Sequence, residues 1–276
     1  MPTKITVKKK NHAMMIVDSE PSVLNELTDF FTFYVPGYKF MPAYKNKVWD
    51  GKIRLYNSQT RELYAGLYAY VKEFANAEGR DYELELEHDA YYGYVDEQTD
   101  PDLSFIDDLI LNDNKGDSIK PRDYQLKAID YALRNKRGML ISPTASGKSL
   151  IIYILLHWYL SNNNKRALII VPTTSLVEQM YSDFAAYSQN DKSFNVDEVQ
   201  RIYSGMPKKS EMPSVIISTW QSIYKLPGAW FEQFGCVFGD EAHNFKAKSL
   251  TSILTKLRDA EYRFGTTGTL DGTQTH

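Results

Sequence analysis

The sequence contains a single cysteine, Cys236, among its 276 residues. One cysteine excludes an internal disulfide and a zinc site built from several thiolates, and it fits a reducing cytoplasm, the location that we expect. Long apolar runs are also missing, because the longest, residues 150–160, contains His157 and is too short to cross a bilayer. Near the amino terminus, three lysines precede only a brief apolar stretch, so we expect no secretory signal.

Charge is unevenly distributed along the chain, although the formal net charge is only −3. Residues 1–72 carry 11 Lys and Arg against 6 Asp and Glu, residues 73–118 carry 2 against 15, and residues 119–276 carry 19 against 14. Two mildly basic blocks therefore flank a strongly acidic one. The basic blocks suit a polyanionic partner, although the near-neutral net charge does not reveal them.

Residues 1–100 have the pattern of a small mixed α/β domain. Apolar side chains recur at helical spacing in residues 20–35, after Ser19, a candidate helix cap. Residues 47–74 contain short strand patterns separated by turns and end in a helical pattern. Residues 81–89 alternate strictly, which predicts a strand with an acidic outer face.

The pattern changes after residues 101–118, which we expect to form an acidic linker because they are rich in Asp and Asn. In residues 119–276, apolar runs of strand length alternate with segments of helix length. The strand-like runs are "GMLIS", "RALIIV", "SVIIST", "GCVFGD" and "YRFGTT". Continuous apolar strands between helices predict an α/β domain with a doubly wound parallel sheet.

A phosphate-binding loop is indicated between the first of these strands and the helix that follows. Residues 142–149 match G-x-x-x-x-G-K-[ST], except that Ser142 replaces the first glycine. The serine is tolerated if the loop leaves the strand without a positive φ angle. In such a loop, backbone N–H groups face the phosphates at the start of the helix, Lys148 reaches the outer phosphates, and the Ser149 hydroxyl ligates Mg²⁺.

A pair of carboxylates follows a later apolar strand, in "CVFGDEAHN". Asp240 would hold Mg²⁺ through water, and Glu241 would orient and deprotonate the attacking water. An Asp-Glu pair alone is also compatible with a solvated turn. Because the pair follows a phosphate loop in the expected order, we predict that Lys148, Asp240 and Glu241 converge on one ATP–Mg²⁺ pocket.

Further segments, in this order, resemble the superfamily-two helicases, specifically their DEAH-box branch. They are "KPRDYQLKAID" at 120–130, "VPTTSLVEQ" at 171–179, "YSG" at 203–205, "ISTWQSI" at 217–223 and "GTTGT" at 265–269. Each match is short and weak by itself, but the joint order is hard to obtain otherwise. The resemblance implies a RecA-like ATP-binding domain, with ATP and Mg²⁺ as cofactors and nucleic acid as partner.

The same resemblance assigns roles to residues at matching positions. For ATP it implies Arg122 and Gln125 at the adenine, and Thr144, Ala145, Ser146, Gly147, Lys148 and Ser149 at the phosphates. For nucleic acid it implies Thr173, Thr174, Ser204, Gly205 and Thr219, which would contact the phosphodiester backbone without reading bases. It also implies that His243, Thr267 and Thr269 couple hydrolysis to movement.

A complete motor of this family has a second RecA-like domain, which closes the nucleotide site and supplies arginine fingers. We expect this chain to be an amino-terminal fragment without that domain. An arginine finger is worth ~10³–10⁵ in rate, so we expect the chain alone to hydrolyse ATP poorly.

Basic and aromatic residues are interleaved in "YKNKVWDGKIRLYNSQTRELYAGL", residues 44–67. Cations suit phosphates, and flat rings stack on exposed bases or wedge at a junction. Alternatively, the aromatic residues are core and the lysines a solvated face. The candidates for nucleic-acid contact here are Lys45, Lys47, Trp49, Lys52 and Arg54.

The first domain and the motor together resemble a group of T-even bacteriophage helicases that act on branched DNA. This resemblance, which covers essentially the whole chain, implies branch migration, fork regression and R-loop unwinding in recombination and replication control. The partner would be branched or duplex DNA, or an RNA–DNA hybrid.

Two other classes of function stay open. One is a phosphotransferase that uses the loop on a small molecule, and the distant acidic pair argues against it. The other is a non-catalytic DNA-binding module with a vestigial pocket, and the intact Lys148, Ser149, Asp240 and Glu241 argue against it.

Overall fold

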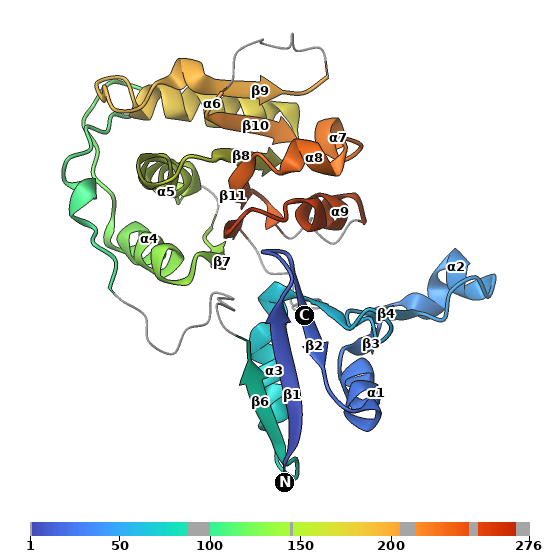
Figure 1. Cartoon of the computed structure of the whole chain (residues 1–276). Helices are drawn as coiled ribbons and strands as arrows, with labels where there is room; N and C mark the ends of the chain where they lie inside the picture. The colour runs from blue at the N-terminus through green and yellow to red at the C-terminus, as the bar shows by residue number, and fades with distance from the viewer. Residues whose placement is uncertain (1, 88–99, 144–145, 205–212, 243–247, 269–276) are drawn as a thin grey trace. The chain divides into compact units, whose positions relative to one another are not determined.

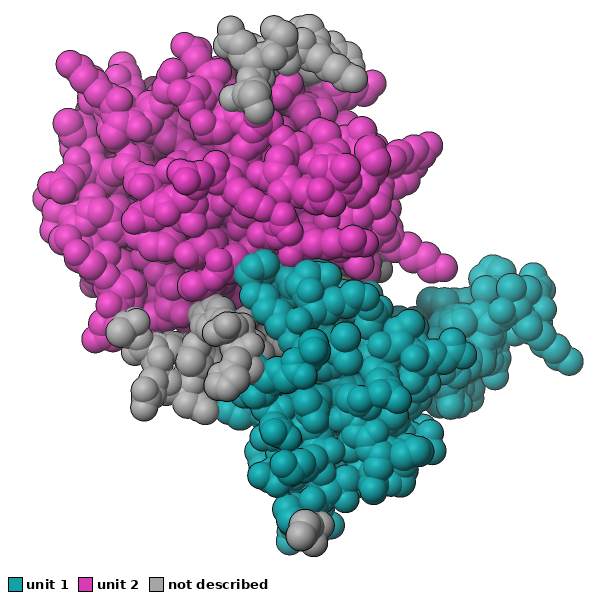
Figure 2. All heavy atoms as spheres, viewed as in Figure 1, with its two compact units in different colours: residues 1–95, 271–276 teal, residues 96–270 magenta. Residues whose placement is uncertain are grey.

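The structure is a computed structural model, and the chain divides into two compact units. One unit comprises residues 1–95 and 271–276, and the other comprises residues 96–270 (Figure 2). The predicted acidic linker therefore falls within the larger unit. The structure describes residues 2–87, 100–143, 146–204, 213–242 and 248–268.

The smaller unit is built on a four-stranded mixed sheet. Its sheet and the helices beside it are β1 (Thr3–Lys9), β2 (Met14–Asp18), α1 (Pro21–Phe30), β5 (Glu62–Tyr64), η2 (Ala65–Leu67), α3 (Tyr68–Ala75) and β6 (Tyr82–Leu86). The strand order is β5-β2-β1-β6, in which only the β1–β6 pair is parallel. Ile5, Val7 and Val17 bury one face of the sheet in a core with Leu27 of α1 and Phe74 of α3.

The opposite face of this sheet is charged. Lys4 pairs with Glu85 at 3.3 Å, and Lys8 pairs with Glu87 at 3.0 Å. The predicted acidic face of the last strand is therefore matched by lysines of β1. All four side chains are about half exposed, so these pairs contribute little stability.

The first helix is shorter than the sequence pattern predicts. It ends at Phe30 instead of continuing to residue 35, because Thr32–Tyr34 forms strand β3. Its cap position is Glu20, not Ser19, whose hydroxyl donates to the Lys4 carbonyl at 2.6 Å. Proline at the first helical position fixes the start of the helix, since its φ angle is already helical.

Residues 32–54 form an arm that extends away from the four-stranded sheet of its unit (Figure 1). Its elements are β3, η1 (Tyr38–Phe40), α2 (Pro42–Lys45) and β4 (Lys52–Arg54), and β3 pairs antiparallel with β4. Tyr38 stacks on Tyr34 with ring centres 4.7 Å apart and meets Tyr44 edge-on at 4.8 Å. Gly51 is needed beside these rings, because a Cβ there would lie 2.2 Å from Tyr38 and its φ angle is +82°.

The larger unit contains a six-stranded sheet in which all neighbouring strands are parallel. The strands are β7 (Arg137–Ile141), β8 (Arg166–Val171), β9 (Val199–Ile202), β10 (Val215–Thr219), β11 (Phe234–Gly239) and β12 (Tyr262–Thr267). Their order is β7-β12-β11-β8-β10-β9. The predicted parallel sheet is confirmed, with β9 as an additional edge strand.

Helices cover both faces of this sheet (Figure 1). The helices of the unit are η3 (Ser104–Ile106), α4 (Asp123–Asn135), α5 (Lys148–Asn162), α6 (Thr174–Tyr187), η4 (Val196–Glu198), α7 (Trp220–Ile223), α8 (Gly228–Phe231) and α9 (Lys248–Lys256). Ile169 of β8 faces the core formed with α4, α5 and α6, whereas the next residue, Ile170, faces the core formed with α7, α8 and α9. This alternation confirms the predicted doubly wound architecture.

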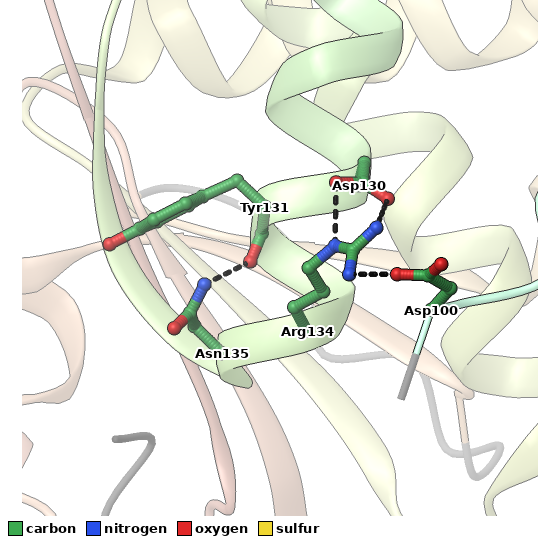
Figure 3. A network of polar contacts seen from close by, with 5 residues as sticks. All are labelled: Asp100, Asp130, Tyr131, Arg134 and Asn135. Atoms are coloured by element: carbon green, nitrogen blue, oxygen red, sulfur yellow. Dashed lines mark hydrogen bonds and ion pairs between the residues drawn. The ribbon is translucent and has the colours of Figure 1, made fainter. Parts of the chain in front are cut away.

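The described part of the acidic segment packs on the larger unit. Ile106 and Leu111 are buried in the core shared with α4 and α5. Arg134 of α4 binds both carboxylate oxygens of Asp130, at 2.8 and 3.0 Å, and also binds Asp100 (Figure 3). Segment and helix are therefore held together by apolar contacts and by an ion-pair network.

No helix in the described parts of the chain has both the length and the hydropathy required to cross a bilayer.

Candidate functional site

The carboxyl ends of three neighbouring strands bring the phosphate loop and the acidic pair to one sheet edge. Ile141, the last residue of β7, pairs with Thr267 of β12, and Gly239 of β11 pairs with Gly265 of β12. Because these strands are parallel, the segments that follow β7 and β11 leave the sheet at the same edge, one strand apart. In open α/β sheets this is the edge where ligands bind.

Gly147 closes the phosphate loop and is the N-cap residue of α5. Its φ angle is +76°, a conformation that other residues rarely adopt, and a Cβ there would lie 2.5 Å from Gln125 Nε2. Ser142, which replaces the usual first glycine, has no positive φ angle, so the condition under which a serine is tolerated is met. Its side chain hydrogen-bonds Ser146 across the loop, and its N–H donates to the Thr267 carbonyl at 2.9 Å. The serine therefore stabilises the loop instead of distorting it.

Lys148 and Glu241 form an ion pair at this edge. Lys148 Nζ lies 3.7 Å from Glu241 Oε1, with the two side chains 13% and 28% exposed. Glu241 has a φ angle of +51°, a strained conformation for a residue other than glycine. The phosphate-loop lysine and the candidate catalytic base thus approach each other, as the sequence predicts.

Asp240 is buried beside this pair. Its carboxylate accepts a hydrogen bond from Thr266 Oγ1 at 2.7 Å, and its N–H donates to the Ile170 carbonyl at 2.9 Å. Thr266 is a site residue that the sequence reasoning missed, although it lies in the predicted "GTTGT" segment. Parallel register would have identified it, since Gly265 pairs with Gly239, the residue before Asp240.

Gln125, one of the two expected adenine residues, contacts the phosphate loop directly. Gln125 Oε1 accepts from the N–H of Arg122 at 2.8 Å, while Gln125 Nε2 donates to the carbonyls of Ser146 and Gly147 at 3.1 and 3.3 Å. Tyr124 also donates to the Ser146 carbonyl, at 2.8 Å. Adenine recognition by Gln125 stays a prediction, and it would require the amide to exchange these partners.

A cavity of about 740 Å³ opens between α4, β7 and the loop. Arg122 and Tyr124 line it from one side, and Ser142, Pro143 and Ser146 line it from the other. Its volume lies within the range of ligand pockets, and its place beside the phosphate loop suits a nucleobase.

The donor set fits Mg²⁺–ATP. Ser149, at the start of α5, offers a hydroxyl oxygen and Asp240 a carboxylate, both hard ligands that Mg²⁺ accepts beside phosphate oxygens and water. Lys148 supplies a cation at the same edge. The Ser149 hydroxyl lies 2.9 Å from the hydroxyl of Tyr187, a contact that no sequence motif indicated.

The candidate backbone-contacting residues lie after β8 and β9 and at the end of β10. Thr173 and Thr174 are exposed at the start of α6, where Thr173 Oγ1 accepts from the Leu176 N–H at 3.3 Å. Ser204 is also exposed. Thr219, in contrast, is buried, and its hydroxyl bonds Ser222 at 2.8 Å. Hydroxyls for phosphate contact are therefore accessible at three of these four positions.

Lys45 and Lys47 of the arm are exposed, as the predicted contact with nucleic acid requires. Trp49 has a structural role, because its Nε1 donates to the Lys52 carbonyl at 2.8 Å. The Lys52 ammonium lies 5.0 Å from the centre of the Tyr34 ring, and Arg54 pairs with Asp50. Of the predicted cationic side chains, Lys45 and Lys47 are therefore exposed to solvent. Lys52 and Arg54 instead contact other side chains of the arm.

Two apolar residues of the arm were not predicted as site residues. Phe40 is 80% exposed and Val48 is 81% exposed. Val48 also borders a cavity of about 550 Å³ that Lys39, Lys45 and Lys47 help to line. The sequence alone does not predict that these two side chains are exposed, because most apolar residues of a folded domain are buried.

Five candidate residues lie outside the described residues. They are Thr144, Ala145, Gly205, His243 and Thr269.

Comparisons with known proteins cover both units. The family described as type III restriction enzyme, res subunit, matches residues 118–272, and the family described as DNA helicase UvsW, N-terminal, matches residues 4–87. The ATP-dependent DNA helicase uvsW of Enterobacteria phage T4 is 36% identical over 258 residues, which cover 92% of this chain and 49% of that protein. The chain thus spans about half the length of this relative.

A crystal structure of the UvsW helicase from bacteriophage T4 matches with a TM-score of 0.84 and 33% identity, covering 99% of this chain and 94% of that chain. The DNA 3'-5' translocase XPB2 of Sulfurisphaera tokodaii is 28% identical over 153 residues, which cover 55% of this chain and 31% of that protein.

Proposed function

The chain belongs to the UvsW family of superfamily-two DNA helicases, and we propose that it is the ATP-binding part of a helicase that acts on branched DNA. The proposed reactions are branch migration, fork regression and unwinding of R-loops, in recombination and replication control. A second RecA-like domain would complete the motor in the full-length protein.

The observation that carries the proposal is the 3.7 Å approach of Lys148 Nζ to Glu241 Oε1 at the carboxyl edge of the parallel sheet. Bound Mg²⁺–ATP would supply the phosphoanhydride bond and the cation that neutralises its phosphates. Lys148 would hold the outer phosphates, and Ser149 and Asp240 would hold the cation. Glu241, freed from its ion pair, would orient and deprotonate the attacking water.

Coupling between hydrolysis and movement would pass through β12. The Thr267 carbonyl accepts from Ser142 in the phosphate loop, while Thr266 donates to Asp240. A displacement of Ser142 or of Asp240 would therefore change the hydrogen bonds at the end of β12. We therefore extend the predicted coupling role of Thr267 to Thr266.

Nucleic acid would contact both units. At the larger unit, the exposed hydroxyls of Thr173, Thr174 and Ser204 suit phosphate contacts that are independent of sequence. At the smaller unit, the arm would add the cations of Lys45 and Lys47.

The direct test is ATP consumption by the chain with single-stranded, duplex and forked DNA, with RNA–DNA hybrid, and with small phosphoryl acceptors. We expect slow turnover that nucleic acid increases, with forked DNA the strongest activator. Consumption that rises only with a small acceptor would instead identify a phosphotransferase.

A further inference from the structure

The hydroxyl of Ser149 is held from the neighbouring helix α6. Ser149 Oγ lies 2.9 Å from the hydroxyl of Tyr187, the last residue of α6, and the two form a hydrogen bond. Tyr187 belongs to no predicted motif.

Packing fixes the position of Tyr187. Its ring meets the ring of Tyr153 at a centroid distance of 5.5 Å and an interplanar angle of 64°, and Tyr153 packs in turn on Phe184. Tyr153 is a fully buried residue of α5, the helix whose second residue is Ser149. The Tyr187 hydroxyl is therefore presented to Ser149 by a ring that is anchored independently of it.

We propose that Tyr187 is a positioning residue that orients the Ser149 hydroxyl for Mg²⁺. This role presupposes the proposed ATP site. A hydroxyl has one proton and two lone pairs. When Ser149 donates its proton to the Tyr187 hydroxyl, both lone pairs remain for a cation. Without this partner the hydroxyl proton is free to rotate toward the cation.

The test is calorimetric titration of the 276-residue chain with ATP at a series of Mg²⁺ concentrations and in EDTA. Removing an outer partner of a metal ligand typically costs about 10–100-fold in metal affinity. We expect Tyr187→Phe to raise the Mg²⁺ concentration for half-maximal ATP binding about 10-fold, without changing ATP affinity in EDTA.

Tyr181→Phe is the matched control, because Tyr181 lies on the same helix with Arg201 over its ring at 4.1 Å. It should retain the unmodified Mg²⁺ dependence. Tyr187→Phe keeps the ring and its packing, and thermal unfolding would verify that the variant is folded.

Unchanged Mg²⁺ dependence in Tyr187→Phe would overturn the positioning role, as would an equal loss of affinity with Mg²⁺ and in EDTA. If the unmodified chain bound ATP no better than Lys148→Ala, the proposed function itself would be overturned. The two failures are therefore distinguishable.

Discussion

The Thr266 hydroxyl donates a hydrogen bond to the Asp240 carboxylate, 2.7 Å away just after the neighbouring strand β11, and both residues are buried. Their positions follow from the register of two parallel strands, in which Gly265 pairs with Gly239. A buried carboxylate needs donors, since leaving one unsatisfied costs free energy. Asp240 therefore depends on β12 for its orientation.

Thr266→Val should remove this donor while preserving the shape of the side chain. We expect the free energy of unfolding to fall by about 1–3 kcal/mol, because the Asp240 carboxylate loses a partner in a buried place. Urea denaturation measures the effect. Thr266→Ser, which keeps the hydroxyl, should lose less, and equal losses in the two variants would show that the hydrogen bond is not the cause.

Gly147→Ala should impair the phosphate loop. The alanine would adopt a positive φ angle, and its Cβ would lie 2.5 Å from Gln125 Nε2. Backbone strain of this kind costs about 1–3 kcal/mol, so ATP affinity measured by calorimetry should fall about 10-fold or more. Gly66→Ala is the control, because nothing lies within 4 Å of a Cβ there. Unchanged ATP affinity in Gly147→Ala would argue against a role of this loop in binding.

Substitutions of Lys148 and of Glu241 should affect ATP binding and ATP hydrolysis differently. Lys148→Ala removes the cation that would hold the phosphates, so we expect calorimetry to show weak or no ATP binding while DNA binding persists. Glu241→Gln should retain ATP binding and lose phosphate release, because an amide does not accept the proton of the attacking water. Phosphate release by Glu241→Gln at the unmodified rate would exclude Glu241 as the base.

The parallel sheet could be predicted from the sequence because its inner strands are continuous apolar runs. The edge strand Val199–Ile202 was missed because two of its four residues, Gln200 and Arg201, are polar. The end of the first helix was placed five residues too late, since the apolar pattern of residues 20–35 continues into strand β3. Periodicity does not distinguish a helix end from a following short strand.

Motifs identified the two halves of the candidate site but not the residues that hold them. Lys148 and Glu241 stand in recognisable segments, and the structure brings them together. Tyr187, on the other hand, lies on α6 outside every predicted motif. Its contact with Ser149 depends on how two helices pack, which the spacing of residues along one helix does not encode.

The arm offers a test of how the smaller unit contacts DNA. Each phosphate contact on duplex DNA changes the slope of log affinity against log salt by about 0.9, so Lys45→Gln combined with Lys47→Gln should reduce that slope by about 2. Binding measured by fluorescence anisotropy at several salt concentrations gives the slope. Lys8→Gln is the control, because Lys8 is paired with Glu87 on the sheet.

The apolar residues of the arm should act differently from its lysines. Phe40 and Val48, about 80% exposed, gain from contact with unpaired bases, which a fork presents and an intact duplex does not. Phe40→Ala and Val48→Ala should therefore weaken binding to forked DNA several-fold more than binding to duplex DNA of equal length, with the salt slope unchanged because no charge is lost. An equal loss on both DNAs would mean that the arm contacts only the backbone.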